Sequence, residues 1–538
     1  MPMSASSSNA WIMHEIKTAD LGDKRLDKRL GNVLEMLSRK PQESITVKSN
    51  NWAEVKAAYR FFDNDGVTMD NVLAPHYSAT LERIKSEAVV LLPQDTTELD
   101  YSSKKATTGI GKLHYENHLG VFLHPVIAVT PARVCLGVVD ANMFIREELG
   151  KDKQYQLPLE QKESVRWLEG YQVAQQIALQ ASGTKIISIA DRECDIYEVL
   201  AEAGAISGQK ADWIIRSSKD RCLKDKDKLR KKLYDSDELG IIEFDIPSTH
   251  KRKARHVVQQ IKAVSVTLRH PYRRPNIDET YTINLISENL PANSVVLENG
   301  LLKFFDGEVF YAADLTNLNK HQKGRLNKVN LEIGQPIDVD TVASLFDAPI
   351  FAKKIEPAPV TINAVLASEI NAPDGVQPVE WILLTSLPIT TVAECIQIIE
   401  YYLCRWQIEV FFKVLKAGCV VEELQLQAMG RLSVCIALYM IISWRILFMT
   451  MLGRSCPDIP CTAVFADEEW KAAYIIVYRK KPPETAPSLN DVIVMIAGFG
   501  GFLKRKCDGF PGSESIWIGL QRVRDFAIGI EAQNALNN

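Results

Sequence analysis

Residues 88–101 read AVVLLPQDTTELDY, a stretch in which a short apolar run gives way to an acid, Asp95. Residues 185–200 read KIISIADRECDIYEVL and repeat the pattern, since a second apolar run leads directly to Asp191 at the start of a helix-like segment. Both runs have the length and the apolar character of buried strands. The sequence thus predicts two core strands that each deliver a carboxylate at their end, within an α/β fold.

Further strands and helices surround these two runs. The segments LHPVIAVT and RVCLGVVDANMF follow the first run and indicate an antiparallel meander. Residues 163–180 form an amphipathic helix for which Ser164 is a candidate cap. After the second run, strand-like segments dominate from about residue 210 to residue 380, and helical character returns at 391–416. The chain therefore reads as an α/β core that carries a large β-rich insertion.

A third acid lies in residues 401–416, YYLCRWQIEVFFKVLK, which read as one helix that is apolar on most of its surface. Because a helix turns by roughly 100° per residue, Tyr402, Glu409 and Lys416 share one narrow stripe, and Arg405 lies at its edge. A polar line set into an apolar helix favours a buried functional site. An ordinary intrahelical ion pair between Arg405 and Glu409 is the alternative that this stretch leaves open.

Length, composition and charge limit the class of protein. The chain has 538 residues, of which 46% are hydrophobic and 24% are charged, as in a soluble globular protein of several domains. Its formal net charge of -4 gives no overall attraction to a polyanion, so any nucleic-acid surface must be local. Local basic runs do occur, at KRLDKRL, KDRCLKDKDKLRKKL, KRKAR, YRKK and LKRK. Each alone is also typical of a solvated face.

Cysteine usage and apolar segments indicate the cellular compartment. The 10 cysteines form no C-x-x-C pair and have no histidine partner at zinc spacing, which fits a reducing cytoplasm. The N-terminus does not have the pattern of a signal peptide. The most apolar segment, residues 432–452, contains Arg445 and is flanked by Arg431 and Arg454, so we predict a buried core helix and no membrane span.

The three acids Asp95, Asp191 and Glu409 can converge in the folded chain. Hard divalent cations prefer oxygen ligands, and two such ions can support an in-line phosphoryl transfer. Carboxylates placed together without cations would repel each other. For Asp95 a turn or helix cap, and for Asp191 a helix N-cap, are the alternative readings of the two aspartates.

Several motifs stand in an order that is characteristic of one enzyme family. The pattern Tyr-x2-Arg-x3-Glu-x6-Lys is complete at Tyr402, Arg405, Glu409 and Lys416. Asp95 lies in a D-T-T context, Asp191 in D-R-E-x-D, and Trp381 opens a W-x-L-L-T-S strand before the helix of the third acid. The GGF segment and the last helix also match. The chain thereby resembles the DDE transposases of bacterial insertion sequence family four, in their transposon-five-like branch.

The resemblance implies a ribonuclease-H-like catalytic core with a β-rich insertion, flanked by helical N- and C-terminal domains. It implies two Mg2+ ions, for which Mn2+ can substitute, bound by Asp95, Asp191 and Glu409. The side chains that it assigns to DNA are Tyr402, Arg405, Lys416, Trp381 and Arg216. Arginine and lysine suit phosphates. Trp381 would stack on a flipped-out base, although core packing is the ordinary role of a tryptophan.

The resemblance also implies an activity and a division into domains. Residues 1–72 would bind the terminal inverted repeats, residues 73–450 would form the catalytic domain with its insertion at about 210–380, and residues 451–538 would form the dimerisation domain. The implied reaction is cut-and-paste transposition: nicking, hairpin formation at the transposon end, reopening, and joining of the 3′-hydroxyl to target DNA. The implied partners are end DNA, target DNA and a second copy of the chain, in the bacterial cytoplasm near the nucleoid.

One segment departs from the family pattern, and two other functions stay open. Between about residues 271 and 359 the chain carries more sequence than its relatives, which could add strands to the insertion or a further DNA or partner contact. A metal-dependent nuclease on the same core, or a non-catalytic DNA-binding descendant of a transposase, are the alternative functions. The presence of all three acids argues against the non-catalytic descendant.

Overall fold

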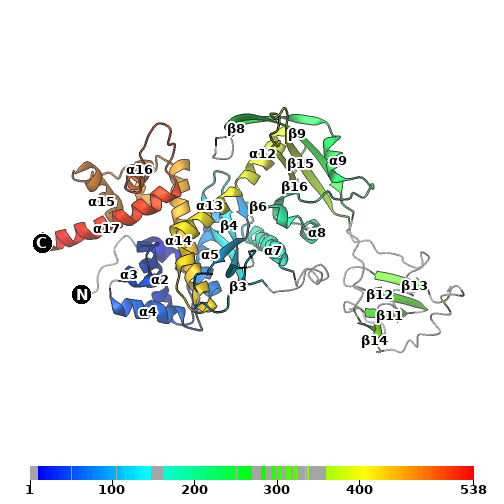
Figure 1. Ribbon diagram of the computed structural model, residues 1–538, viewed down its shortest axis with the longest axis horizontal. Coiled ribbons are helices and arrows are strands. Elements are labelled where there is room, and N and C mark those ends of the chain that lie inside the picture. Colours follow the sequence, from blue (N-terminus) through cyan, green and yellow to red (C-terminus); the bar gives the residue numbers. More distant parts are fainter. Residues whose placement is uncertain are drawn as a thin grey trace.

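A computed structural model gives the fold of the chain (Figure 1). It describes residues 10–146, 162–269 and 359–537, apart from residues 50, 105, 116, 207, 247 and 249–252. Between 269 and 359 it describes residues 280–284, 294–298, 300–305, 310–314, 336–338 and a few single residues.

The N-terminal part of the chain is helical, as predicted. Its helices are α1 (Ala10–Glu15), α2 (Lys24–Arg39), α3 (Ile45–Lys48), α4 (Trp52–Phe62) and α5 (Met69–Lys85). Helix α2 begins after Asp23, whose side chain accepts a hydrogen bond from the backbone N–H of Arg25. The apolar side chains of Leu30, Val33 and Leu37, at helical spacing, are buried and pack this helix against the rest of the molecule.

The centre of the molecule is a mixed sheet whose first five long strands follow one another in the chain. They are β1 (Val89–Pro93), β4 (Leu119–Val129), β5 (Cys135–Phe144), β6 (Lys185–Ala190) and β7 (Asp212–Arg216), with the short β2 (Thr97–Asp100) and β3 (Gly111–Lys112) beside β4. In space they run β5-β4-β1-β6-β7, with β1, β6 and β7 parallel and β4 antiparallel to β1 and β5. This order is the one expected of a ribonuclease-H-like core, so the mixed α/β fold class is confirmed.

The β-rich insertion extends this same sheet. After β7 the order continues β16-β15-β9-β8, with every pairing antiparallel. These strands are β8 (Glu238–Ile246), β9 (Arg255–Thr267), β15 (Thr361–Glu369) and β16 (Glu380–Thr385), and α9 (Leu229–Tyr234) precedes them. The insertion is therefore built onto the edge of the core.

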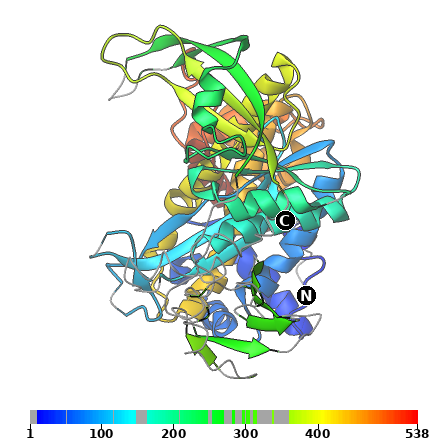
Figure 2. The same cartoon turned by 90° about the vertical axis from the view of Figure 1, so that its right-hand side faces the viewer.

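A second, smaller sheet arises from the extra segment at about 271–359. Its order is β13-β12-β11-β10-β14, formed by β10 (Thr280–Asn284), β11 (Ser294–Glu298), β12 (Leu301–Phe305), β13 (Phe310–Asp314) and β14 (Pro336–Asp338). It is drawn apart from the large sheet in Figure 1 and lies nearest to the viewer in Figure 2. The extra strands thus form a sheet of their own, and most of the rest of that segment lies outside the described residues.

Several helices pack around the large sheet. They include α7 (Val165–Gln180), α8 (Tyr197–Ala205) after the 3-10 turn η3 (Arg192–Cys194), and the long α14 (Met429–Ser455). Ser164 precedes α7 but makes no side-chain cap hydrogen bond, so that predicted cap was wrong. Helix α14 is long and apolar enough to cross a membrane, yet 89% of its most apolar window is buried inside the fold, as predicted for a core helix.

The predicted single helix at 391–416 is wrong in one respect, because it is broken. Helix α12 (Val392–Leu403) ends before α13 (Trp406–Lys413), and a π-helical segment, η5 (Val414–Gly418), follows. At the break the backbone N–H groups of Cys404 and Arg405 donate to carbonyls three residues back, both at 3.0 Å. This tighter turn changes the angle between successive side chains, so the stripe of Tyr402, Glu409 and Lys416 is not continuous.

The C-terminal part of the chain is helical, as the resemblance implied. Helix α14 runs to Ser455, and α15 (Asp467–Tyr478), α16 (Leu489–Phe499) and α17 (Ser513–Asn537) follow. The predicted boundary at 450/451 falls inside α14, and the domain limits stay predictions. Helix α17 lies beside the N-terminal helices at the left of Figure 1, where Lys40 pairs with Asp525 at 3.0 Å.

Candidate active site and DNA-binding surface

The register of two parallel strands brings the first two acids together. Strand β1 pairs with β6 at a constant offset, from Val89 with Lys185 to Pro93 with Ile189. The pairing continues one step further, because the backbone N–H of Gln94 donates to the carbonyl of Ile189 at 3.0 Å. The same offset sets Asp95 beside Asp191 just past the strand ends, as the acid-at-strand-end pattern predicted.

The residues on either side of Asp95 are held by side chains that the sequence did not single out. The His124 ring contacts Thr96 Oγ1 at 2.8 Å through Nδ1 and Gln94 Oε1 at 3.2 Å through Nε2. Arg166, on α7, donates to Thr96 Oγ1 at 3.0 Å and pairs with Glu193 at 3.3 Å. Arg166 therefore links the loop of the first acid to the turn that follows the second.

The electrostatic environment of Asp95 is unusual for an aspartate. Burial is the main reason that its pKa is raised to about 6. The positive charge of Arg405 opposes this rise, and the negative charge of Asp191 adds to it. Two carboxylates so close that one raises the pKa of the other are typical of a functional site.

Arg405 joins the first acid to the third. Its Nη1 donates to Asp95 Oδ2 at 2.7 Å, and its Nη2 donates to Glu409 Oε1 at 2.6 Å. The intrahelical ion pair that the sequence left open thus exists, but it is half of a bridge between α13 and the end of β1. The N-cap alternative for Asp191 is also real, since Asp191 Oδ1 accepts from the N–H of Glu193 at 2.8 Å. Neither interaction prevents these carboxylates from belonging to one site.

Of the residues predicted to contact DNA, Tyr402 is buried beside the acids, whereas Lys416 is partly exposed. Burial raises the pKa of Tyr402, and the charges that act on it next are those of Arg405, Arg216 and Asp191, which places its hydroxyl among the candidate residues. Lys416, by contrast, lies on η5, where its Nζ is 3.4 Å from Glu422 Oε1. The side chain of Lys416 is 31% exposed and can reach solvent.

Trp381 lies in a different part of the fold, at the start of β16. Its ring stacks on that of Phe244 from β8, with centroids 6.2 Å apart and planes 7° from parallel. Both side chains are half-buried. Phe244 has no place in the motifs read from the sequence, and two strands separate β8 from β16 in the sheet, so the sequence does not predict this contact.

Asp195, the last acid of the D-R-E-x-D motif, has a clear role that the sequence did not predict. Its side chain is fully buried and pairs with Arg221, whose Nε donates at 2.8 Å. It also accepts from the backbone N–H groups of Ser218 at 2.7 Å and Lys219 at 2.9 Å. Asp195 thereby fixes the loop that follows Arg216 to the turn that follows Asp191.

The donor set fits a hard cation in its chemistry. Asp95, Asp191 and Glu409 offer carboxylate oxygens only, which suit Mg2+, and a cation would relieve the repulsion between the adjacent aspartates. Within the described ranges, no three or more His, Cys, Asp or Glu side chains are gathered closely enough to hold a metal ion. Arg405 lies between two of the three acids, so metal binding would require it to give up at least one of its pairs.

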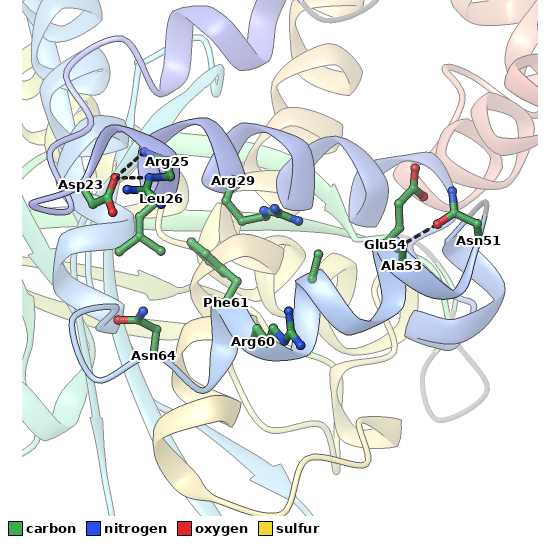
Figure 3. A pocket seen from close by; sticks show the side chains of 11 residues that line it. Asp23, Arg25, Leu26, Arg29, Asn51, Ala53, Glu54, Arg60, Phe61 and Asn64 are labelled. Atoms are coloured by element: carbon green, nitrogen blue, oxygen red, sulfur yellow. Dashed lines mark hydrogen bonds and ion pairs between the residues drawn. The ribbon is translucent and has the colours of Figure 1, made fainter.

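A groove on the N-terminal helices offers a second candidate site, about 620 Å³ in volume, between α2 and α4 (Figure 3). Arg25 and Arg29 line it from α2, and Arg60 lines it from α4. Asn51 and Asn64 lie at the two ends of α4 and add polar side chains. Three guanidiniums along one groove can bind successive phosphates. Of these residues, Arg25 and Arg29 belong to the basic run KRLDKRL, whereas Arg60 is brought in by the packing of α4.

Comparison with protein families agrees with this arrangement. Residues 8–67, which include the groove, match a family model described as transposase DNA-binding. Residues 441–536, which run from α14 into α17, match one described as the transposase Tn5 dimerisation domain. Between these regions lies the mixed sheet with its acids at the strand ends. The matches support a Tn5-like transposase, a protein that binds DNA and forms homodimers.

Proposed function

We propose that this chain is a cut-and-paste DNA transposase of the DDE type, with the Tyr-x2-Arg-x3-Glu-x6-Lys signature of insertion sequence family four. The observation that supports the proposal is the pairing of two acids at adjacent strand ends, one of which is bridged by an arginine to the third acid. Asp95 and Asp191 are neighbours across β1 and β6, and Arg405 joins Asp95 to Glu409. Bringing carboxylates close together is electrostatically unfavourable, and such arrangements occur mostly at functional sites.

Asp95, Asp191 and Glu409 would hold two Mg2+ ions, or Mn2+ in their place. The bound cations would supply charge neutralisation at the phosphate and an activated water or 3′-hydroxyl. Arg405 would hold the carboxylates apart and in position, and would turn from Glu409 toward a DNA phosphate when the substrate binds. Tyr402 would fix the position of Arg405 from the buried side. No covalent bond between protein and DNA is needed.

The activity that follows is a series of phosphoryl transfers at one site. Water cleaves one strand at the transposon end, and the freed 3′-hydroxyl attacks the opposite strand to form a hairpin. A second water reopens the hairpin, and the same 3′-hydroxyl then attacks target DNA. Trp381 would stack on the base that leaves the duplex at the hairpin, while Arg216 and Lys416 would bind the backbone.

The groove of Arg25, Arg29 and Arg60 would bind the terminal inverted repeats. Because the chain as a whole has a formal net charge of -4, attraction to DNA has to come from such local clusters. The C-terminal helices would pair two chains in the synaptic complex. The reaction would take place in the bacterial cytoplasm.

The experiment that tests this function is excision from a supercoiled plasmid that carries the element's own ends. With Mg2+, the native chain should release the element and give transient hairpin ends, whereas Glu409→Ala should bind the ends and cut nothing. Glu400→Ala, at an exposed position of the preceding helix α12, is the matched control. Binding without metal-dependent cutting by the native chain would favour a non-catalytic DNA-binding protein, and cutting without joining would favour a nuclease.

A further inference from the structure

The π-helical segment η5, which carries Lys416, is contacted from both ends of the chain. Gln42, between α2 and α3, donates through Nε2 to the carbonyl of Ala417 at 3.3 Å. Glu514, in the first turn of α17, pairs with Lys413 at 3.1 Å, just before η5 begins. Both Lys413 and Glu514 are largely exposed, so this pair adds little stability. A stable contact between α17 and η5 therefore requires another side chain of α17.

That side chain is Trp517. It is 4% exposed, and its ring lies over Gly418, the last residue of η5. A Cβ atom built on Gly418 would lie 3.1 Å from ring atoms Cδ2 and Cε3 of Trp517. This distance is too short for an ordinary carbon contact. A side chain at position 418 would force the Trp517 ring to shift by a few tenths of an ångström, so α17 packs closely on the backbone of η5.

The conformation of the segment depends on such support. Cys419 N–H donates to the carbonyl of Val414 at 2.9 Å, a bond across five residues that defines the π-helical turn. Val420 then adopts φ 53° and ψ 41°, in the left-handed region. A β-branched residue is strained in this region and persists there only when surrounding contacts impose it. The backbone that carries Lys416 is thus held in place by its packing.

We propose that Trp517 is a positioning residue for Lys416, through which the C-terminal helix α17 controls how firmly the chain holds DNA at the active site. The inference rests on the proposed function of Lys416 as a phosphate contact. It adds a physical link between the region that matches a dimerisation domain and the helix that carries Glu409 and Lys416. When Trp517 is lost, η5 relaxes toward an ordinary helix and the Lys416 amine leaves the position from which it reaches the phosphate.

The test is the salt dependence of binding to the element's end, measured with the full chain. The slope of log K against log salt is negative, and each lost phosphate contact lowers its magnitude by roughly 0.9. Lys416→Gln and Trp517→Phe should each lower it by about one contact, and the double variant should lower it no further, because both changes remove the same contact. Gly418→Ala, which pushes a methyl group against the Trp517 ring, should have the same effect.

The matched control is Trp470→Phe, a buried tryptophan of α15 whose ring nitrogen donates to Asp467. It should leave the slope unchanged. Native melting temperature and unchanged dimer mass in Trp517→Phe and Gly418→Ala exclude general unfolding. If Lys416→Gln lowers the magnitude of the salt slope as expected but Trp517→Phe and Gly418→Ala do not, the inference about Trp517 is wrong and the proposed role of Lys416 still holds. No effect of Lys416→Gln overturns the inference and contradicts the proposed role of Lys416 as well.

Discussion

Arg166 is the residue through which the loops of the first two acids are linked. It reaches Thr96, 70 positions earlier in the chain, and Glu193 on the turn after Asp191. The sequence predicted Asp95 and Asp191 because an acid after an apolar strand is a local pattern. It did not predict Arg166, since a long-range hydrogen bond leaves no local pattern. For the same reason, the sequence did not predict the ion pair between Arg405 and Asp95.

Arg166→Met should leave DNA-end binding intact and slow cleavage. The methionine keeps the apolar stem but loses the contacts with Thr96 and Glu193 and the hydrogen bond to the Glu163 carbonyl, so the loops of Asp95 and Glu193 become free to shift. A displacement of about 1 Å at a reacting site can cost up to 10²-fold in rate. Single-turnover cleavage with bound DNA measures this loss. Arg146→Met, which removes a similar pair with Glu163, is the control and should cut at the native rate.

Asp195→Ala should destabilise the fold by about 3 kcal/mol, because it leaves the buried Arg221 and two backbone N–H groups without an acceptor. The change appears as a lower unfolding midpoint in denaturant. Asp225→Ala removes an ion pair with Lys232 on the exposed side of the same basic segment and should leave the midpoint unchanged. Equal midpoints for Asp195→Ala and the native chain would contradict the role given to this loop anchor.

At the scale of elements, the strands were easier to predict than the helix of the third acid. Apolar runs with turn signals at their ends identify strands such as β1 and β6 without help from the rest of the fold. The spacing of residues 401–416 predicted one helix, but the chain forms α12, α13 and η5 in succession. Helical periodicity records which residues are buried, and it does not record whether hydrogen bonds span three, four or five residues.

The Phe244 ring of β8 stacks on the Trp381 ring of β16, and a prediction follows from this contact. Phe244→Ala should let the Trp381 ring move, so that it stacks less firmly on a displaced base. A fluorescent base analogue at the hairpin position of the end DNA should then lose less of its emission on binding than with the native chain. Tyr115→Ala, a change at an exposed aromatic residue of the core sheet region, is the control. Equal quenching by Phe244→Ala and the native chain would show that Trp381 needs no support from β8.

At the scale of the whole molecule, a buried charged cluster ties the N-terminal helices to the core. Glu15, on α1, contacts His76 Nδ1 at 2.6 Å and Arg83 Nη1 at 2.6 Å, both on α5. His76 Nε2 accepts from the N–H of Val138 on β5 at 3.0 Å, so the neutral ring carries its proton on Nδ1 and donates it to Glu15. The attachment of the DNA-binding region to the sheet therefore depends on one carboxylate.

This cluster predicts a loss of stability in acid. Burial alone would raise the pKa of Glu15, but the hydrogen bond from His76 and the hydrogen bonds and positive charge of Arg83 outweigh burial and lower the pKa to about 2. The carboxylate thus stabilises the fold at pH above its unfolded value of 4.5, and this contribution disappears as the pH falls toward 2. Its size is on the order of 2–3 kcal/mol.

Calorimetry of Glu15→Gln against the native chain measures this contribution. The melting temperature of the variant should lie well below that of the native chain at pH 7, and the difference should shrink as the pH falls from 4.5 toward 2. A difference that stays constant over this range would mean that the charge of Glu15 does not stabilise the junction.

The proposed function requires Asp95, Asp191 and Glu409 to form one metal-binding site for phosphoryl transfer. Anomalous diffraction from crystals of the chain bound to its own end DNA and soaked in Mn2+ tests this requirement. We predict Mn2+ bound to oxygens of all three carboxylates, with Arg405 turned from at least one of them to a DNA phosphate. Mn2+ bound elsewhere, or Arg405 still bridging Asp95 and Glu409 with no ion between the acids, would contradict it.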